Sequence, residues 1–251
     1  MDTQNTSAPH RKPSFMNTSN ASDAYRILVI NAKGDAGKTT VSTNLAAWLA
    51  YRDEVTVLVD ADDSQASHSW VQQRSTDLPP VHGFKIDTQL NLPKSTQWII
   101  TDAPAEISGE TLDDVVLDHD LIIIPVMPSD IDIRTTARFI GELLLTPTMR
   151  RQRRPIAVVA NRIKQQSDSW ERLQKFLNSL HIPYPATLRD TQNYVRAYRE
   201  GQGVVDYQQQ AYLRDRADWE MLIQWIDTQY AEYQQRGTET AESMLKEKRE
   251  A

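Results

Sequence analysis

The chain of 251 residues contains no cysteine. This absence excludes disulfide bridges, cysteine-ligated zinc sites and catalysis by a thiolate. Long apolar runs are also missing, because the longest fall far short of the ~20 residues that cross a bilayer. The first residues hold no apolar segment of the kind found in secretory signals. We therefore expect a soluble, cytoplasmic protein that does not associate with a membrane.

Positive charge is scarce as well. The chain has 28 lysines and arginines against 34 aspartates and glutamates, which gives a formal net charge of −6. Binding to nucleic acid would therefore depend on a local basic patch and not on the overall charge. Hydrophobic residues make up 39% of the chain, enough for one large α/β domain or two small ones.

The two ends of the chain differ in composition from its middle. Residues 1–22 are rich in Ser, Thr, Asn and Pro and show no apolar periodicity, so we predict a disordered N-terminal extension. Residues 235–251 are predicted to form a charged C-terminal tail that frays or extends the last helix. The compact domain is expected to span residues 23–234.

Between these ends, short apolar runs alternate with longer amphipathic segments. The apolar runs are continuous in Ile, Val and Leu, which indicates strands buried on both faces of a parallel sheet. The expected strands are 26–31, 55–60, 97–102, 121–126, 156–161 and, more weakly, 184–188. The expected helices are 38–51, 64–74, 109–118, 131–145, 168–180, 191–200 and 211–234. This order predicts an α/β fold, doubly wound around a mostly parallel sheet, with ligands bound where the strands end.

The most informative segment is the stretch 31–40, which reads Asn-Ala-Lys-Gly-Asp-Ala-Gly-Lys-Thr-Thr between a predicted strand and a predicted helix. Backbone N–H groups in such a turn bind anions together with the helix dipole, so we call this stretch the phosphate loop. Lys38 would reach the β- and γ-phosphates of a nucleotide, and the Thr39 hydroxyl would bind Mg²⁺. Ala32 stands where the usual phosphate-loop pattern has its first glycine, so this stretch departs from that pattern. A second lysine, Lys33, precedes Gly34 and Gly37. The residues expected to contact the nucleotide here are Gly34, Asp35, Ala36, Gly37, Lys38, Thr39 and Thr40.

Two of the predicted strands have an aspartate as their last residue. Asp60 and Asp102 each end a strand, which places both at the sheet edge beside the phosphate loop. Mg²⁺ takes oxygen ligands, so Thr39, Asp60 and Asp102 are its candidate ligands. Asp62 would orient or deprotonate an attacking water. One aspartate after a strand is more often a helix cap or turn former, but two beside a phosphate loop favour a metal site.

Together these residues resemble the ParA/MinD family of ATPases, whose Walker A loop carries an additional lysine. The resemblance covers roughly residues 25–210 and implies ATP and Mg²⁺ as cofactors. It also implies an ATP-sandwich homodimer in which Lys33 reaches the nucleotide bound by the second subunit. Lys33, Lys38 and Asp62 would then be catalytic. Asn161 and Arg162 match the family's adenine-contacting position.

Segments 79–83 and 188–197 resemble one branch of that family, the McdA type, which spaces carboxysomes over the nucleoid. This likeness implies a nucleoid-associated protein that binds double-stranded DNA non-specifically. It also implies a ParB/McdB-like adaptor that stimulates ATP hydrolysis. Plasmid or chromosome partition by the same chemistry is the alternative function. A ligase-type enzyme of the same superfamily is disfavoured because the chain lacks a cysteine nucleophile.

Seven arginines are the candidate DNA contacts. Some precede the predicted strand at 156 and the others lie near the predicted helix 191–200. They are Arg150, Arg151, Arg153, Arg154, Arg189, Arg196 and Arg199. Contacts of this kind bind phosphates without reading sequence, and their affinity falls steeply with salt. For the first four, a solvated charged loop is an equally supported interpretation.

Asp35 departs from the family, which has a glycine at this position. Glycine allows unusual φ values and close approach to phosphates, and aspartate tolerates left-handed backbone better than most residues. A carboxylate ~4 Å from a phosphate oxygen would repel it by roughly 4 kcal/mol at an effective dielectric of ~20, and by much less if it points to solvent. We therefore expect slow or weak use of ATP. A hydrolysis-poor, nucleotide-dependent binding module is the alternative of another class.

Overall fold

A seven-stranded parallel sheet forms the centre of the molecule. The structure, a computed structural model, describes residues 23–86, 90–105 and 107–250, so the predicted N-terminal extension lies outside it. The strand order is β3-β2-β4-β1-β5-β6-β7, and every pairing is parallel. The strands are β1 (Tyr25–Val29), β2 (Val55–Asp60), β3 (Val81–Lys85), β4 (Thr96–Asp102), β5 (Leu121–Val126), β6 (Ile156–Ile163) and β7 (Ala186–Arg189). The predicted doubly wound α/β fold is confirmed.

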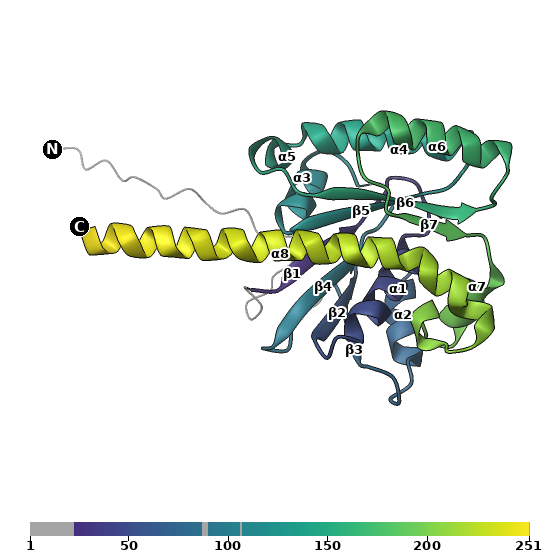
Figure 1. Cartoon of the computed structure of the whole chain (residues 1–251), viewed down its shortest axis with the longest axis horizontal. Coiled ribbons are helices and arrows are strands. Elements are labelled where there is room, and N and C mark those ends of the chain that lie inside the picture. The colour runs from purple at the N-terminus through teal and green to yellow at the C-terminus, as the bar shows by residue number, and fades with distance from the viewer. Residues whose placement is uncertain (1–22, 87–89, 106, 251) are drawn as a thin grey trace.

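Helices cover both faces of this sheet (Figure 1). They are α1 (Lys38–Ala50), α2 (Ala66–Gln73), α3 (Gly109–Leu117), α4 (Asp130–Leu145), α5 (Pro147–Arg151), α6 (Asp168–Leu180), α7 (Gln192–Arg199) and α8 (Leu213–Glu250), with 3-10 turns η1 (Val204–Asp206) and η2 (Gln210–Tyr212). Two large buried clusters lie on opposite faces of the sheet, and a third, smaller one packs against β2 and β4. One large cluster joins the sheet to α1, α2, α7 and α8, and the other joins it to α3, α4, α5 and α6. Successive residues of β1 alternate between these clusters, which explains why its apolar run is continuous.

Three elements differ from the prediction. The apolar pattern does not predict β3, because His82 and Gly83 interrupt it; pairing with β2 makes the strand. The short α5 starts at Pro147 after a Thr146 cap, a combination typical of helix starts that the pattern of apolar residues does not report. Helix α8 continues to Glu250, so the expected tail extends the last helix.

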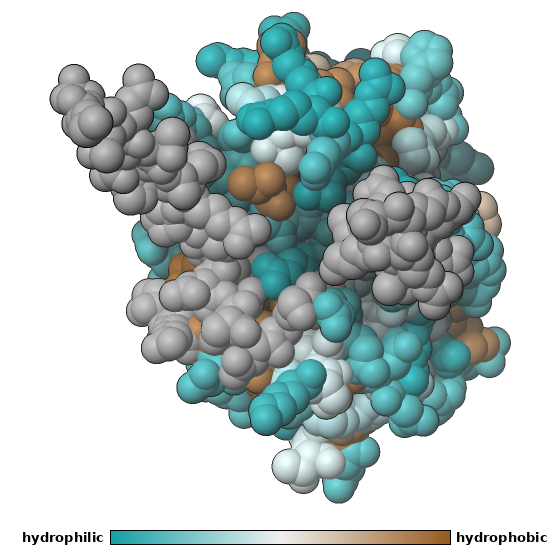
Figure 2. Space-filling model, turned by 90° about the vertical axis from the view of Figure 1, so that its left-hand side faces the viewer, coloured by the Kyte–Doolittle hydropathy of each residue, from teal (hydrophilic) through white to brown (hydrophobic). Residues whose placement is uncertain are grey.

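The N-terminal ends of all seven parallel strands lie along one side of the sheet, which we call the start edge. Aromatic side chains pack against α8 there. The rings of Tyr25 and Trp98 pack edge to face at 5.7 Å, and both rings contact Tyr230 of α8. Beyond this contact α8 extends past the sheet (Figure 1). Figure 2 views the molecule from this side and shows a mostly hydrophilic surface with small, separate apolar patches. Among the helices of the described residues, none is long and apolar enough to cross a membrane.

Candidate nucleotide-binding site

The phosphate loop lies at the opposite edge, which we call the end edge because the strands end there. It connects β1 to α1, whose first residue is Lys38. Gly37 immediately precedes the helix with φ 92°, and a Cβ on it would lie 2.0 Å from Asn161 Nδ2. Both the left-handed backbone and the close approach therefore require glycine at this position. The loop ends at a helix N-terminus, as an anion site of this kind requires.

Asp35 adopts the backbone conformation that glycine favours. Its φ is 59° and its side chain is exposed. The departure from the family pattern therefore leaves the turn intact, since aspartate is one of the residues that visit this region. The Asp35 charge still acts on the buried Lys38. Burial lowers the pKa of Lys38, and the carboxylates of Asp102, Asp62 and Asp35 oppose that shift.

A hydroxyl–carboxylate pair lies under the loop. Thr39 Oγ1 donates to Asp102 Oδ2 at 2.8 Å, and Ser42 Oγ donates to Asp102 Oδ1 at 3.2 Å. Asp102 is 1% exposed, and burial raises the pKa of its carboxyl to about 7. The Thr39 bond opposes this rise, whereas the negative charge of Asp60 adds to it. The structure thus brings two of the three predicted magnesium ligands into direct contact.

Asp60, the third predicted ligand, lies opposite Asp102 in the β2–β4 register. Its Oδ1 accepts the backbone N–H of Asp62 at 3.0 Å, and its Oδ2 accepts that of His68 at 2.8 Å. Both carboxylate oxygens of Asp60 therefore accept hydrogen bonds from the backbone. Oδ1 binds the loop after β2, and Oδ2 binds the first turn of α2.

Asp62 is half-buried, and its Oδ1 accepts the Ser64 N–H at 3.0 Å. Burial raises the pKa of its carboxyl, but hydrogen bonds from Ser64 and the charge of Lys38 outweigh burial and leave the pKa below its ordinary value. A carboxylate that ionises so readily is a weak base. Of its two predicted tasks, orienting a water therefore suits Asp62 better than removing a proton.

The donor set can be tested against Mg²⁺. Thr39 and Asp102 offer oxygens 2.8 Å apart at a helix N-terminus. Within 23–86, 90–105 and 107–250 no group of three or more His, Cys, Asp or Glu is arranged to hold a metal ion. Mg²⁺ is commonly held by one or two carboxylates together with waters and substrate phosphates. The residues therefore fit a magnesium ion that binds with a nucleotide, not a site built from protein groups alone.

Asn161, two residues before the end of β6, holds the phosphate loop. Its Nδ2 donates to the Ala36 carbonyl at 3.0 Å, and its Oδ1 accepts the Arg162 N–H at 2.9 Å. The predicted adenine contact would thus involve an amide that already makes two bonds. A cavity of about 470 Å³ begins beside Asn161 and Arg162 and is walled by Thr39, Thr40 and residues of α7. Cavities of this size accommodate small-molecule ligands, and this one adjoins the loop where a nucleoside would extend.

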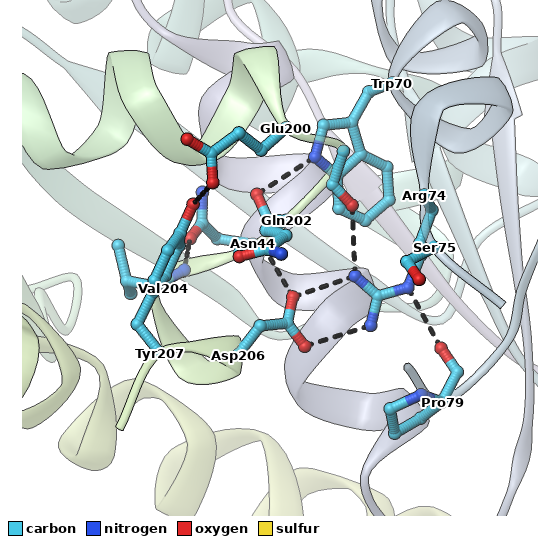
Figure 3. A network of polar contacts seen from close by, with 12 residues as sticks. Asn44, Trp70, Arg74, Ser75, Pro79, Glu200, Gln202, Val204, Asp206 and Tyr207 are labelled. Carbon is cyan, nitrogen blue, oxygen red and sulfur yellow. Dashed lines mark hydrogen bonds and ion pairs between the residues drawn. The ribbon is translucent and has the colours of Figure 1, made fainter. Parts of the chain in front are cut away.

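A polar network holds the segment that follows α7 against α1 and the end of α2 (Figure 3). Asn44 of α1 accepts the Val204 N–H at 2.8 Å and donates to the Thr40 carbonyl. Arg74, the residue directly after α2, forms an ion pair with Asp206 at 2.8 Å, with both side chains almost fully buried. The apolar pattern predicts neither the Asn44–Val204 bond nor the Arg74–Asp206 pair, because the two partners of each lie more than a hundred residues apart in the sequence.

The seven predicted DNA-contacting arginines do not form one patch. Arg150 and Arg151 end α5, and Arg153 and Arg154 precede β6, so these four lie toward the start edge. Arg154 is within 3.9 Å of Asp120. The other three lie at the end of β7 or on α7.

At the end edge, Arg189 closes β7 and forms ion pairs with Asp215 and Asp218 of α8. Its charge is therefore largely compensated. Arg196 and Arg199 are exposed on α7. The predicted DNA surface thus divides into two candidates on opposite edges.

Comparison with known proteins agrees with this geometry. Residues 27–204 match the model of the CobQ/CobB/MinD/ParA nucleotide-binding domain. The chain is 29% identical over 189 residues to "Maintenance of carboxysome distribution protein A" of Halothiobacillus neapolitanus, covering 72% of this chain and 87% of that protein.

Solved structures share the fold at lower identity. A McdA–ATP complex from Cyanothece superposes with a TM-score of 0.63 at 12% identity, over 80% of this chain and 97% of that one. A plasmid partition protein from Borrelia burgdorferi gives 0.54 at 14% identity, over 72% and 96%. The family match spans well over half of the chain, from β1 to η1. The chain therefore belongs to the CobQ/CobB/MinD/ParA nucleotide-binding domain family.

Proposed function

We propose that this protein is a Mg²⁺-dependent ATPase that positions a cargo. ATP closes a homodimer around two nucleotides, and the dimer binds nucleoid DNA non-specifically. A ParB/McdB-like adaptor then stimulates hydrolysis and releases the dimer. The observation that carries this proposal is the Thr39–Asp102 pair beneath a loop that contains both Lys33 and Lys38.

Each residue has a task in this scheme. Lys38 offers its ammonium to the β- and γ-phosphates, and the phosphate loop supplies backbone N–H groups. Thr39 and Asp102 hold the magnesium ion with the phosphates. Asp62 orients the attacking water. Lys33 adds positive charge at the phosphates of the partner subunit, and such a cation supplied in trans stabilises the transition state of phosphoryl transfer.

The proposed cargo is the carboxysome. The support is the likeness to proteins whose name is maintenance of carboxysome distribution protein A. The alternative is plasmid or chromosome partition, which the shared fold of the Borrelia burgdorferi partition protein supports only at the level of architecture. Genes adjacent to this one distinguish the two, since a carboxysome role predicts shell-protein genes nearby.

The alternative of another class, a hydrolysis-poor binding module, rests on Asp35. Its exposed side chain removes the steric part of that argument and leaves the charge. We therefore favour hydrolysis, at a rate that Asp35 reduces.

The proposal is tested by measuring the molecular mass and the DNA binding of the protein with ADP, ATP and a slowly hydrolysed ATP analogue. We expect a monomer off DNA with ADP and a dimer on DNA with the analogue. ATP should give transient binding that ends as phosphate is released. A protein that stays monomeric and off DNA with the analogue would contradict the mechanism.

A further inference from the structure

Asn31 has a buried side-chain amide and lies two residues after the end of β1, as the first residue of the phosphate loop. It has no exposed surface and makes three hydrogen bonds. Its Nδ2 donates to the Pro125 carbonyl at 2.7 Å and to Thr136 Oγ1 at 2.9 Å, while its Oδ1 accepts the Lys33 N–H at 3.0 Å. The first two partners belong to β5 and α4, so tertiary contacts determine the direction of this amide.

The hydrogen bond from the Lys33 N–H to Asn31 joins residues close in the sequence, but the contacts that orient the Asn31 side chain come from distant residues. A side-chain oxygen that accepts the N–H two residues later is a common turn device that forms and breaks easily on its own. Here the two bonds donated by Nδ2 restrict Asn31 to one rotamer. The Lys33 N–H is thereby held in place relative to β5 and α4.

Lys33 is also held from its other side. Its carbonyl lies 3.4 Å from Lys38 Nζ, which donates to it. The backbone N–H and C=O of Lys33 therefore both have hydrogen-bond partners. These two bonds fix the backbone orientation of Lys33, and with it the direction of its Cα–Cβ bond. A half-buried lysine on such a backbone loses less conformational freedom when it contacts a ligand outside its own loop.

We infer that Asn31 is a positioning residue that directs Lys33 toward the nucleotide of the second subunit. This rests on the proposed function, in which Lys33 acts across the dimer. Asn31 itself is buried and does not reach the phosphates. Its effect on turnover should therefore pass entirely through Lys33.

A double-mutant cycle on the full chain tests this, with Asn31→Ala, Lys33→Ala and the double variant compared for ATP turnover. Residues that act through one another show non-additive effects. We expect Asn31→Ala to lower kcat about tenfold and the double variant to match Lys33→Ala within about twofold. The affinity of the monomer for a fluorescent ATP analogue should change by less than about threefold, since the loop residues that hold phosphate remain.

Thr136→Val serves as the milder variant. It keeps the side-chain shape and the Asn31–Lys33 bond but removes one acceptor of Nδ2. We expect a smaller loss of kcat, which disappears when Lys33 is already alanine. Melting temperatures of all variants separate this from loss of fold.

Two results would overturn the inference while the proposed function stands: Asn31→Ala with wild-type turnover, or effects that multiply in the double variant. Turnover that is absent in the wild type, or unchanged by Lys33→Ala, would instead refute the proposed function and the inference with it.

Discussion

The two edges of the sheet are built from different chemistry. At the end edge, the strand ends carry buried polar side chains, among them Asn31, Asp102 and Asn161, each hydrogen-bonded to loop backbone or to hydroxyls. At the start edge, the aromatic rings of Tyr25 and Trp98 pack against α8. Aromatic burial stabilises a fold, whereas an ionisable group without a cation partner costs stability. Residues at the start edge should therefore stabilise the fold. Some residues at the end edge should lower the stability of the fold, because they are placed for binding a ligand.

Trp98→Ala should give the largest effect on stability. Trp98 has no exposed surface, and removing so large a buried side chain costs about 3–5 kcal/mol. We expect this loss in urea unfolding, with ATP-analogue affinity unchanged under conditions where the variant is folded. Tyr230→Phe keeps the ring contacts of the same cluster and should lose little. A variant that weakens ATP binding without loss of stability would break the contrast between the edges.

Asp102→Asn should act in the opposite direction on the nucleotide-free protein. The pKa of Asp102 rises from 3.8 to about 7 in the folded state because of burial. The folded state thus takes up a proton that the unfolded state releases, so this group's stabilising contribution is full below pH 3.8 and is lost as the pH rises through about 7. The Asp102→Asn variant has no carboxyl to ionise at this position, so it avoids this pH-dependent loss of folding stability, which is on the order of 4 kcal/mol at most.

The measurement is urea unfolding at about pH 5 and about pH 8 without magnesium. We expect the variant to gain more stability over the wild type at the higher pH, while its ATP hydrolysis is abolished. Asp206→Asn is the matched control, because that buried carboxylate is paired with Arg74. Its loss should destabilise the fold at both pH values. Equal behaviour of the two variants would show that the direct ion pair of Asp206 with Arg74 is not what distinguishes it from Asp102.

Charge reversal decides which edge binds DNA. Arg151→Glu with Arg153→Glu alters the start edge, and Arg196→Glu with Arg199→Glu alters the end edge. We expect the first pair to lower DNA affinity at least about tenfold at about 50 mM salt and to reduce the salt dependence, with ATP binding unchanged. A loss confined to the second pair would move the DNA surface to α7. Unchanged affinity in both would remove these arginines from the proposal.

Asp35→Gly should give the smallest effect. The turn already has the glycine-like φ of 59°, so the substitution changes charge and not shape. Because the carboxylate is exposed and screened, we expect a gain of about threefold in ATP affinity and turnover, smaller at high salt. Equal constants for both proteins would show that Asp35 does not limit this enzyme.

Local patterns predicted most of this fold. The continuous apolar runs and amphipathic segments indicated six of the seven strands and seven of the helices. The bounds agree to within a few residues except at the end of α8, which continues to Glu250 although the predicted helix stops at residue 234. They missed β3, since its five residues include His82 and Gly83 and it depends on pairing with β2. They also missed Asn31, although an asparagine between a strand and a glycine-containing turn was a readable signal. Its partners in β5 and α4 lie 94 and 105 residues away.

The sequence by itself determined the α/β class, the family and the chemistry of the phosphate loop, because these depend on residue types at short spacings. Only the tertiary structure decided how those residues are held. It set Thr39 against Asp102, occupied both oxygens of Asp60 with backbone, and separated the arginines onto two edges. The physical reason is that a parallel sheet brings together strand ends that are distant in the chain, and hydrogen bonds between them follow from the strand order.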